Sequence, residues 1–220
     1  FPTRRSSDLI RLQSGNQFYN SGNNETLRNG VGFYIHRTIA PMVKDFVSIS
    51  DRVCFALIQL SKQTKIKIIQ VYAPTSNSTE EEIEEFYISV EHAITNNRTK
   101  HVIIMADFNA KIGQKKENER SVGNFGVGTR NERGERLVTF CEYWKFSIMN
   151  SFFKKKDKRK WTWRSPNGTT RNEIDFIISS TQKIIQDVNV FNCFNTGSDN
   201  RLVISKFRLN LKIRDRKSVV

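Results

Sequence analysis

Short runs of β-branched and aromatic residues recur along the chain and are separated by polar, turn-forming segments. Runs of this kind predict β-strands, and here they fall at residues 31–36, 53–60, 66–72, 101–106, 161–163, 174–178, 188–191 and 202–207. Most links between consecutive runs are too short for the crossover helix that parallel neighbours require. We therefore expect two packed β-sheets with helices outside them, and not a doubly wound parallel sheet.

Two segments carry the 3.6-residue apolar period of an amphipathic helix. The first begins after Ser78, which forms a capping-box pattern with Glu81, and its apolar face consists of Ile83, Phe86, Tyr87, Val90 and Ile94. The second begins after Asn131 and would bury Leu137, Phe140, Cys141 and Trp144. Helices and strands are mixed along the chain, so the predicted fold class is α/β, of the α+β type.

The composition indicates a folded protein with one domain. The chain has 220 residues, of which 37% are hydrophobic and 11% aromatic, enough for a single core. No repeat or flexible linker divides it, and no apolar run approaches the roughly 18 residues that span a bilayer. The cysteines, Cys54, Cys141 and Cys193, lie too far apart for a disulfide framework or a zinc spacing, which fits a reducing, intracellular compartment.

The net charge indicates that a partner, if there is one, is negatively charged. With 36 Lys+Arg against 22 Asp+Glu, the formal charge is +14, and such a field attracts polyanions. DNA, RNA and anionic membrane surfaces all fit the charge alone, as does a basic protein that is merely soluble.

The candidate catalytic or metal-binding residues are three acids at the ends of predicted apolar strands. Asp107 ends the apolar run 101–106, Asp175 begins another run, and Asp199 comes just before the run 202–207. Burying ionised carboxylates is costly, so three acids beside core strands need cations, hydrogen-bond donors or a metal ion. Oxygen ligands without clustered His or Cys favour Mg²⁺ or Mn²⁺ over zinc. Taken singly, each acid also fits a plainer role, as a turn residue, a partner of an arginine or a cap.

Four motifs around these acids carry a family resemblance. They are Val-Tyr-Ala-Pro at 71–74, Ala-Asp-Phe-Asn at 106–109, Trp-Thr-Trp at 161–163 followed by Ile-Asp-Phe at 174–176, and Ser-Asp-Asn-Arg-Leu-Val at 198–203. Their order and spacing resemble the endonuclease/exonuclease/phosphatase superfamily. Asn-Phe-Gly at 124–126 and Asn-Glu-Arg-Gly at 131–134 are most similar to the apurinic-type endonuclease domain of non-LTR retrotransposon polyproteins and to craniofacial development protein 2-like proteins.

The resemblance implies a fold, a reaction and a set of site residues. The fold is a four-layer sandwich of two mixed β-sheets flanked by helices, and the reaction is Mg²⁺- or Mn²⁺-dependent hydrolysis of DNA that leaves a 3′-hydroxyl at a nick. The resemblance assigns the attacking water to Asp107, a hydrogen bond to the phosphoryl oxygens to Asn109, a phosphate contact to Tyr72, the metal to Asp199 and the orientation of the family's histidine to Asp175. Tyr72 also fits a plainer role, as the end of a strand that packs beneath Pro74.

The histidine position of the family is occupied by Asn200 in this chain. An amide forms hydrogen bonds but cannot carry a proton or a positive charge at neutral pH. Losing one such transition-state group costs on the order of 2.7 to 4 kcal/mol. His36 and His92 fit structural roles, and His101 lies six residues before Asp107, about 20 Å away along an extended strand. We therefore expect an impaired enzyme.

The ends of the chain depart from the family pattern. Family members begin with a strand that carries an Asn and a segment that carries a metal-binding Glu, and neither motif precedes Ile10. We expect residues 1–9 to be a non-native leader, residues 10–211 to be the endonuclease/exonuclease/phosphatase domain without its N-terminal strands, and residues 212–220 to be a non-native or disordered tail.

Two basic stretches flank the strand ends that carry the acids. They supply the candidate contacts to DNA, which are Lys111, Lys115, Lys116, Lys158, Arg159 and Lys160. Each stretch fits a solvated loop equally well. Trp161 and Trp163 alternate along a predicted strand, and we expect them to pack in the core rather than to stack on bases.

Three functions fit these observations. They are a nicking endonuclease of retrotransposon origin, a non-catalytic DNA-binding relic of one, and a phosphatase of the same fold. We favour the endonuclease by ancestry, impaired in its present form. The expected partner is DNA and not a membrane, a monomer is the expected state, and the nucleus is the expected location. A reverse transcriptase domain in the parent polyprotein is a candidate neighbour.

Overall fold

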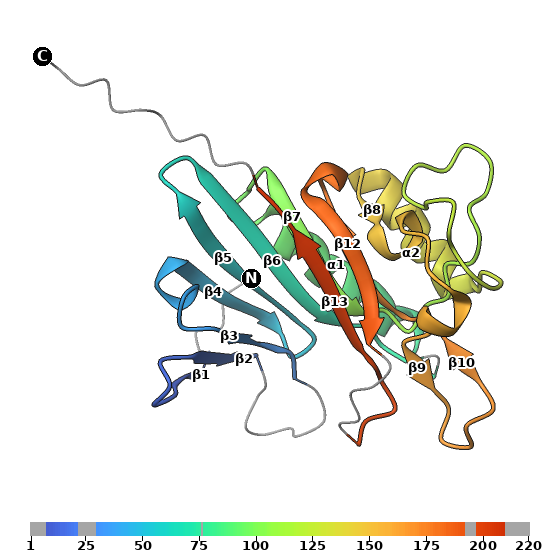
Figure 1. Ribbon diagram of the computed structural model, residues 1–220, viewed down its shortest axis with the longest axis horizontal. Coiled ribbons are helices and arrows are strands. Elements are labelled where there is room, and N and C mark those ends of the chain that lie inside the picture. The colour runs from blue at the N-terminus through green and yellow to red at the C-terminus, as the bar shows by residue number, and fades with distance from the viewer. Residues whose placement is uncertain (1–7, 22–29, 76, 192–196, 210–220) are drawn as a thin grey trace, which may run out of the picture.

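The computed structural model describes residues 8–21, 30–75, 77–191 and 197–209. The helices are α1 (Glu80–Thr95) and α2 (Glu132–Trp144). The strands are β1 (Asp8–Arg11), β2 (Gln17–Asn20), β3 (Gly32–Ile35), β4 (Val43–Ser50), β5 (Val53–Ser61), β6 (Thr64–Tyr72), β7 (His101–Asp107), β8 (Ser147–Ile148), β9 (Trp163–Arg164), β10 (Arg171–Asn172), β11 (Asp175–Ser179), β12 (Ile185–Phe191) and β13 (Leu202–Phe207). Figure 1 shows how they are arranged. Within the described residues, no helix is long and apolar enough to cross a membrane.

A six-stranded mixed sheet organises the molecule. Its strand order is β4-β5-β6-β7-β11-β8, and its neighbours are antiparallel except for β6 and β7, which are parallel. A parallel pair requires a crossover connection, and α1 lies in the segment that connects β6 to β7. This crossover brings the C-terminal ends of both strands to one edge of the sheet, which is where the candidate acids begin.

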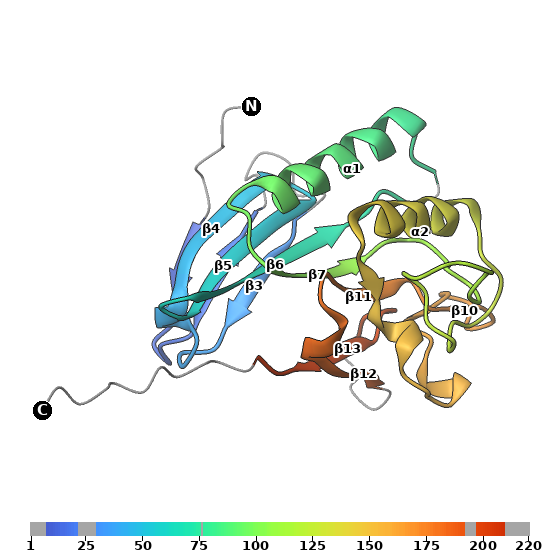
Figure 2. The same cartoon turned by 90° about the horizontal axis from the view of Figure 1, so that it is seen from above.

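The two faces of this sheet bury alternate residues of each strand. On one face, Phe55, Ile69, Ile104 and Phe176 pack with both helices in one core cluster. On the other face, Cys54 and Ala56 pack against the β1-β2-β3 sheet, while Ile66, Ile103 and Ile177 pack against the β12-β13 pair. Figure 2 shows the helices on one side of the sheet and β12 and β13 on the other. The predicted α/β architecture of packed sheets flanked by helices is confirmed.

The N-cap of helix α1 lies one residue later than predicted. Thr79, not Ser78, is the N-cap: its hydroxyl oxygen accepts a hydrogen bond from the Glu82 backbone N–H at 3.3 Å, and the Glu82 carboxylate accepts one from the Thr79 N–H at 3.1 Å. The sequence offers the capping pattern in both registers, Ser78 with Glu81 and Thr79 with Glu82. The predicted apolar face, which comprises Ile83, Phe86, Tyr87, Val90 and Ile94, is buried throughout.

Helix α2 begins where the sequence predicts and is tied to the loop after β7. The Asn131 side chain accepts hydrogen bonds from the backbone N–H groups of Gly134 and Lys111, both at 2.9 Å. Leu137, Phe140 and Cys141 are buried as expected. Trp144 is only partly buried, because its indole N–H reaches Glu91 at the edge of α1, at 3.3 Å.

Each predicted strand overlaps a strand of the structure, and the structure contains further strands that were not predicted. The run 161–163 is shorter as a strand than expected, because only β9 (Trp163–Arg164) pairs there. The short or mixed-polarity strands β1, β2, β4, β8 and β10 were not predicted. Strand β1 includes Asp8 and Leu9 of the expected leader, paired with Asn20 and Tyr19. The rest of that leader and the tail 212–220 lie outside the described residues.

Gly134 tests the contact between α2 and the loop after β7. A Cβ atom on Gly134 would lie 1.8 Å from the Lys111 carbonyl oxygen. In an open helix, Gly→Ala raises the free energy of unfolding by about 1 kcal/mol. We expect Gly134→Ala to lower the free energy of unfolding instead, by about 3 kcal/mol, because the backbone at Lys111 or in α2 must move to make room for the added methyl group. Urea denaturation of both proteins measures the difference.

The matched control is Gly128→Ala. Gly128 has a φ of +75° and no atom within 4 Å of an added Cβ, so the control loses only the roughly 1 kcal/mol of a left-handed alanine. A stabilised Gly134→Ala variant would show that this contact is absent.

Candidate functional site

Three candidate residues lie side by side at one end of the six-stranded sheet. Asp107 at the end of β7 is in register with Tyr72 at the end of β6 and with Asp175 at the start of β11. Neighbouring strands lie about 4.8 Å apart, so the three residues form one row across the sheet. A cavity of about 530 Å³ is lined by Tyr72, Asp107, Asp175 and Asn200.

Asp199 and Asn200 reach this row by pairing with β9. Asn200 forms an antiparallel bridge with Trp163. The Trp163 indole N–H donates to the Asp199 carboxylate at 2.8 Å, and the Arg164 backbone N–H donates to the Asp199 carbonyl at 3.1 Å. The Asp199 side chain is exposed, whereas Asn200 is partly buried. Backbone pairing thus holds Asp199 and Asn200 next to the carboxylate row.

The acids interact electrostatically. Burial raises the pKa of Asp175 to about 7, with smaller increases from the charges of Asp107 and Asp199, and a hydrogen bond from Thr162 opposes the shift. Burial also raises the pKa of Asp107; the backbone N–H of Asn109 lowers it, and the Asp199 charge raises it again. Because each shift contains a contribution from a neighbouring acid, Asp107, Asp175 and Asp199 lie within electrostatic range of one another.

Two buried oxygen atoms of this site have no hydrogen-bond partner among the described residues. They are Oδ2 of Asp175 and Oδ1 of Asn200. Both residues line the same cavity, and both atoms are acceptors. Buried polar atoms are normally paired, so the site is arranged for a donor or a cation that the described side chains do not supply.

Asn109 is held in a strained turn beside the row. Its φ is +49°, in the left-handed region that asparagine tolerates better than most residues. Its backbone N–H donates to the Asp107 carboxylate at 2.9 Å, and its side-chain amide donates to the Ala73 carbonyl at 3.0 Å. The turn thus fixes the Asp107 carboxylate and joins the loop after β6 to the loop after β7.

Carboxylate oxygens suit a hard cation such as Mg²⁺, but the described residues form an incomplete site. No group of three or more His, Cys, Asp or Glu side chains is arranged to hold a metal ion within the described ranges. Asp107, Asp175 and Asp199 are close enough to repel one another and too spread out to enclose one ion.

The predicted basic contacts are dispersed. Lys111 and Lys158 line a second cavity, of about 650 Å³, together with Trp161 and Arg171. Lys115 and Arg159 are exposed, and the ammonium group of Lys116 forms an ion pair with Glu135 at 2.6 Å.

Lys160 does not lie on the surface. It is 3% exposed, and its ammonium group donates to the backbone carbonyls of Phe125 and Asn150. Burial lowers the pKa of Lys160, and the charges of Glu173 and Asp157 oppose that shift. An ammonium group that is buried and donates to two backbone carbonyls is not available to a phosphate, so the expectation of a DNA contact at Lys160 is wrong.

The two tryptophans also differ from expectation. Neither belongs to a buried core cluster of the described residues; both are partly exposed. Trp163 holds Asp199, and the guanidinium groups of Arg171 and Arg201 lie over the Trp161 ring. Only Thr162, between them, is fully buried, and its hydroxyl oxygen accepts hydrogen bonds from the backbone N–H groups of Ile174 and Asp175 at 3.0 and 3.1 Å. The two tryptophans do lie on the same side of this segment, as predicted, but the side that is buried is the one that carries Thr162.

Sequence reasoning missed Thr162, Asn150 and the arginines around Trp161. Asn150 donates to the Asp175 carbonyl at 3.0 Å and accepts from the Ile177 N–H at 2.9 Å, so it anchors β11 from the side. The sequence signal for Thr162 was its place in the middle of Trp-Thr-Trp. Asn150 lies in a helical turn with no distinguishing pattern.

Known proteins resemble this chain in sequence and in fold. A family described as endonuclease-reverse transcriptase matches residues 66–204. The chain belongs to this family, within the endonuclease/exonuclease/phosphatase superfamily. It is 34% identical over 198 residues to craniofacial development protein 2 of Bos taurus and, equally, of Tragulus javanicus. These matches cover 89% of the chain but only 33% and 34% of the relatives, so the chain spans about a third of their length.

Solved structures share the fold. The 3′ phosphatase NExo from Neisseria, bound to a product DNA hairpin, has a TM-score of 0.64 at 15% identity, covering 89% of this chain and 80% of that one. An endonuclease/exonuclease/phosphatase family protein from Leptotrichia buccalis has a TM-score of 0.57 at 14% identity, covering 90% and 74%. The family match and these structures show that the chain has the fold of the endonuclease/exonuclease/phosphatase superfamily.

The titration of Asp175 gives a testable consequence for stability. Because its folded pKa is about 7 and its unfolded value is near 3.8, the folded state binds more protons between these values. Stability then falls as pH rises through this window, by up to about 4 kcal/mol in total. Asp175→Asn removes this loss, so its advantage over the unmodified chain should grow from pH 4 to pH 8 in urea denaturation.

Glu85→Gln, on the exposed side of α1, serves as the control that removes a carboxylate elsewhere. A constant difference between Asp175→Asn and the unmodified chain across pH would show that Asp175 is ionised throughout.

Proposed function

We propose that this chain is part of a metal-dependent phosphodiester hydrolase of DNA, a nicking endonuclease of retrotransposon origin whose chemical step is impaired by Asn200. The row of Tyr72, Asp107 and Asp175 beside Asp199 and Asn200 carries the proposal. These are the positions to which the family resemblance assigns the reaction, and they come from four separate segments of the chain.

Asp107 is the proposed base that positions and deprotonates the attacking water. The Asn109 N–H fixes its carboxylate, and its raised pKa brings it nearer to the range in which a carboxylate removes a proton. Asn109 uses one amide hydrogen on the Ala73 carbonyl and has a second for a phosphoryl oxygen. Tyr72, the neighbour of Asp107 in the row, is the proposed phosphate contact.

Asp199 is the proposed ligand of Mg²⁺ or Mn²⁺, because its carboxylate is the exposed member of the three acids. A bound divalent ion would supply positive charge to the phosphoryl oxygens. Trp163 holds one oxygen of Asp199 at 2.8 Å and so orients the carboxylate.

Asn200 is the proposed defect. The unpartnered Asp175 Oδ2 is an acceptor, and an imidazole at position 200 would offer it one N–H and the substrate another. The amide of Asn200 instead leaves its own Oδ1 unpartnered. Asp175 then has no imidazole to orient, and the phosphate loses a partner that can carry positive charge as negative charge develops on it.

The charge and the fold support DNA as the substrate. The net charge of +14 favours a polyanion, and Lys111, Lys115, Lys116, Lys158 and Arg159 are the proposed contacts to its backbone. One protein of the same fold was solved with a DNA hairpin. We propose that the domain acts as a monomer in the nucleus, next to a reverse transcriptase domain, as the name of its family suggests.

A non-catalytic DNA-binding relic is the second candidate, and Asn200 favours it. Such a protein would keep its basic contacts and lose cleavage. It differs from the endonuclease only in whether residual hydrolysis can be detected.

Nicking of supercoiled plasmid separates the two. We expect residues 1–220 to show little or no nicking with Mg²⁺ or Mn²⁺, because the described acids do not enclose an ion. In the longer parent protein, Asn200→His should raise the single-turnover rate about a hundredfold or more, as expected for one restored transition-state donor. Adding Asp107→Ala to the Asn200→His variant should abolish the increase in rate. This control excludes a contaminating nuclease as the source of nicking.

Two results would contradict the proposal. Robust nicking by the unmodified chain, abolished by Asp107→Ala, would show that Asn200 is no defect. A parent protein with Asn200→His that never nicks would exclude the endonuclease and favour the relic.

A further inference from the structure

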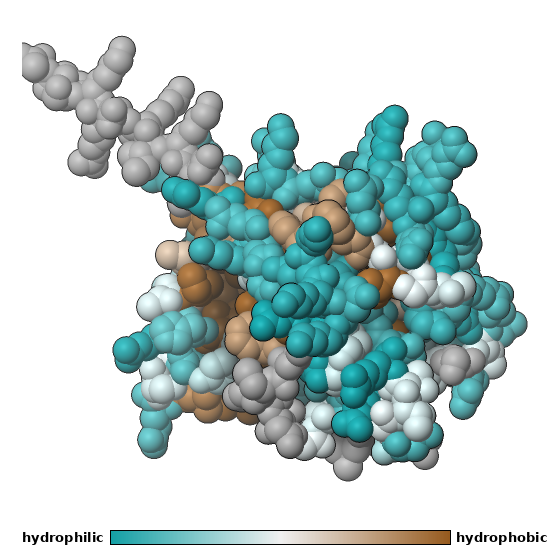
Figure 3. All heavy atoms as spheres, turned by 45° about the vertical axis from the view of Figure 1, so that its right-hand side comes forward, coloured by the Kyte–Doolittle hydropathy of each residue, from teal (hydrophilic) through white to brown (hydrophobic). Residues whose placement is uncertain are grey.

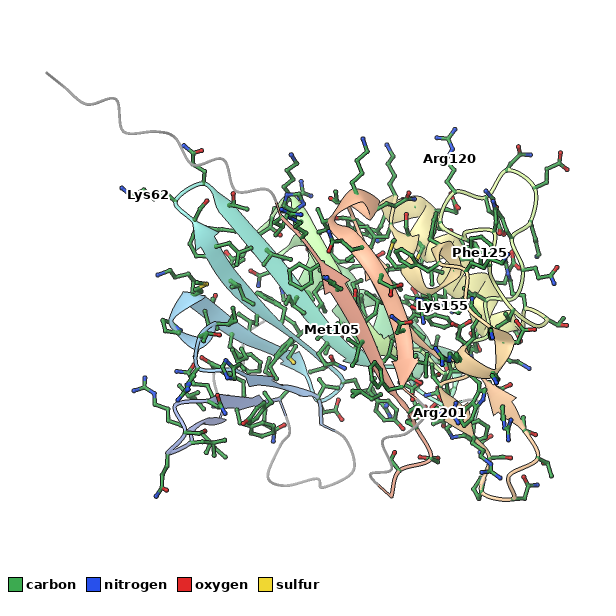
Figure 4. All side chains as sticks on the ribbon, viewed as in Figure 1. Lys62, Met105, Arg120, Phe125, Lys155 and Arg201 are labelled. Atoms are coloured by element: carbon green, nitrogen blue, oxygen red, sulfur yellow. The ribbon has the colours of Figure 1, made fainter. Side chains whose placement is uncertain are left out.

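A third cavity, of about 460 Å³, lies at the end of the six-stranded sheet opposite the acids. It is lined by the β5–β6 turn and by the link between α1 and β7, and we call it the turn cavity. His101, which lines it, and Asp107 are the two ends of β7, so about 20 Å separates the turn cavity from the acids. Figure 4 shows Lys62 at the β5–β6 turn and Arg201 toward the other end of the sheet.

Four exposed cationic side chains line the turn cavity. They are Lys62 and Lys65 at the β5–β6 turn, and Arg98 and Lys100 in the link before β7. Among the described residues, no Asp or Glu lines the turn cavity, and none of these four cations forms an ion pair. The Lys100 charge lowers the pKa of His101, after burial as the larger cause. A hollow lined by charges of one sign concentrates ions of the opposite sign.

The two segments that carry these cations are anchored to each other. The start of β6 pairs in parallel with the start of β7. The buried Lys67 ammonium of β6 donates to the carbonyls of Ala93 and Ile94 at the end of α1, at 2.7 and 3.0 Å. The Asn97 side-chain amide, in the link before β7, donates to the Asp45 carboxylate of β4 at 3.3 Å. The cations therefore extend from segments whose backbones are held by the sheet.

The lining of the turn cavity suits phosphate groups that are recognised by charge. The Arg98 guanidinium can donate to phosphate oxygens in pairs, whereas each lysine acts as a single positive charge. Gln63 and Thr64 add an amide and a hydroxyl group to the lining. No Phe, Tyr or Trp of the described residues lines the cavity, so bases have no large aromatic ring on which to stack. These features favour the backbone of a nucleic acid over its bases.

A membrane surface fits the turn cavity less well. Protein segments that lie on membranes insert apolar or aromatic side chains beside their cations. Leu209 is the only hydrophobic residue among the described residues of the lining, and it is partly buried. Figure 3 shows hydrophilic side chains that protrude along the upper edge of the molecule, the edge at which Figure 1 places the β5–β6 turn. A hollow with a polar rim suits a polar polymer better than a flat bilayer.

We propose that Lys62, Lys65, Arg98 and Lys100 bind the backbone phosphates of a nucleic-acid strand other than the one that faces the acids. The turn cavity and the acids lie at opposite ends of β7. A duplex bound at the acids would have to bend around the molecule to reach the turn cavity, and such bending costs free energy. The inference goes beyond the proposed function, because it uses none of the residues to which that function is assigned.

The test is the salt dependence of binding to a labelled single-stranded oligothymidylate of about eight nucleotides, measured by fluorescence anisotropy in EDTA. We expect Lys62→Gln/Arg98→Gln to weaken binding and to lower the slope of log K against log salt by about 1.4, since each lost contact to a single strand removes about 0.7. Lys62→Arg/Arg98→Lys keeps both charges and should keep the slope. Oligouridylate of the same length should give the same result, because the contacts are to phosphates.

The matched control removes one lysine and one arginine charge elsewhere. Arg120 and Lys145 are exposed and lie outside the turn cavity, and Figure 4 shows Arg120 far from Lys62. Arg120→Gln/Lys145→Gln should leave the slope nearly unchanged. Thermal melting shows whether each variant folds. If Lys62→Gln/Arg98→Gln does not fold, Lys65→Gln/Lys100→Gln replaces it, with the same expected fall in slope.

An equal fall in slope for the turn-cavity variant and the control, or no fall for the turn-cavity variant, would overturn the proposal. A turn-cavity variant might instead bind the oligonucleotide normally but lose sedimentation with phosphatidylserine vesicles, or lose the binding of inositol hexakisphosphate in calorimetry. Either loss would also overturn it, because the anion would then be a lipid headgroup or a free polyphosphate. Binding is measured without metal or hydrolysis, so this result and the nicking experiment can fail independently.

Discussion

Electrostatic repulsion among Asp107, Asp175 and Asp199 is the constraint on which this end of the molecule depends. Burial and the charges of neighbouring acids raise the free energy of the ionised forms of Asp107 and Asp175. Each of the three carboxylates is restrained by a donor, which is the Asn109 N–H, the Thr162 hydroxyl or the Trp163 indole. A flexible site would relax by moving the acids apart. That they stay together means that the surrounding sheet supplies the rigidity.

That rigidity comes from the parallel pairing of β6 with β7 and from the way α1 is closed between them. Lys67 of β6 is fully buried, and its ammonium group donates to the carbonyls of Ala93, Ile94 and Asn96 at the end of α1. Burial lowers the pKa of Lys67 to about 8. A helix end leaves carbonyls without partners, and here the sheet itself provides the donor. The crossover is thereby locked to the strand that ends at Tyr72.

The sequence predicted the parts of this structure that have a strong period or a complete motif. The long strands β5, β6 and β7 were predicted because they are runs rich in β-branched and other apolar residues, and the apolar face of α1 because its residues repeat with the helical period. Strand β4 was missed because Lys44, Asp45, Ser48 and Ser50 interrupt its apolar residues, and it pairs on one side only. The cap of α1 was displaced by one residue because two capping patterns overlap there. Local sequence cannot separate two such registers.

The candidate site also contains residues that local motifs predict and residues that only the folded structure reveals. Motifs pointed to Asp107, Asp175 and Asn200, which line one cavity in the structure, because the two acids lie at the ends of predicted strands and Asn200 lies shortly before one. Lys160 was misplaced because its neighbours are basic and exposed, and only tertiary packing reveals that its ammonium group lies within range of the Glu173 charge. The contact of Arg171 and Arg201 with Trp161 could not be predicted, because these residues meet only once the β9–β10 hairpin has folded. Charge placed by long-range pairing leaves no local signal in the sequence.

Under the proposed function, the way Asn200 is held would allow cleavage to be lost while DNA binding is kept. Its contribution to the fold is made by its backbone, which bridges to Trp163, while its side chain faces the cavity. A change of side chain there removes a proton carrier without disturbing the pairing that positions Asp199 and Arg201. Cleavage depends on single atoms that titrate, whereas attraction of a polyanion depends on a sum of charges over many residues. Under the proposed function, a substitution at position 200 would therefore act on cleavage and spare the attraction of a polyanion.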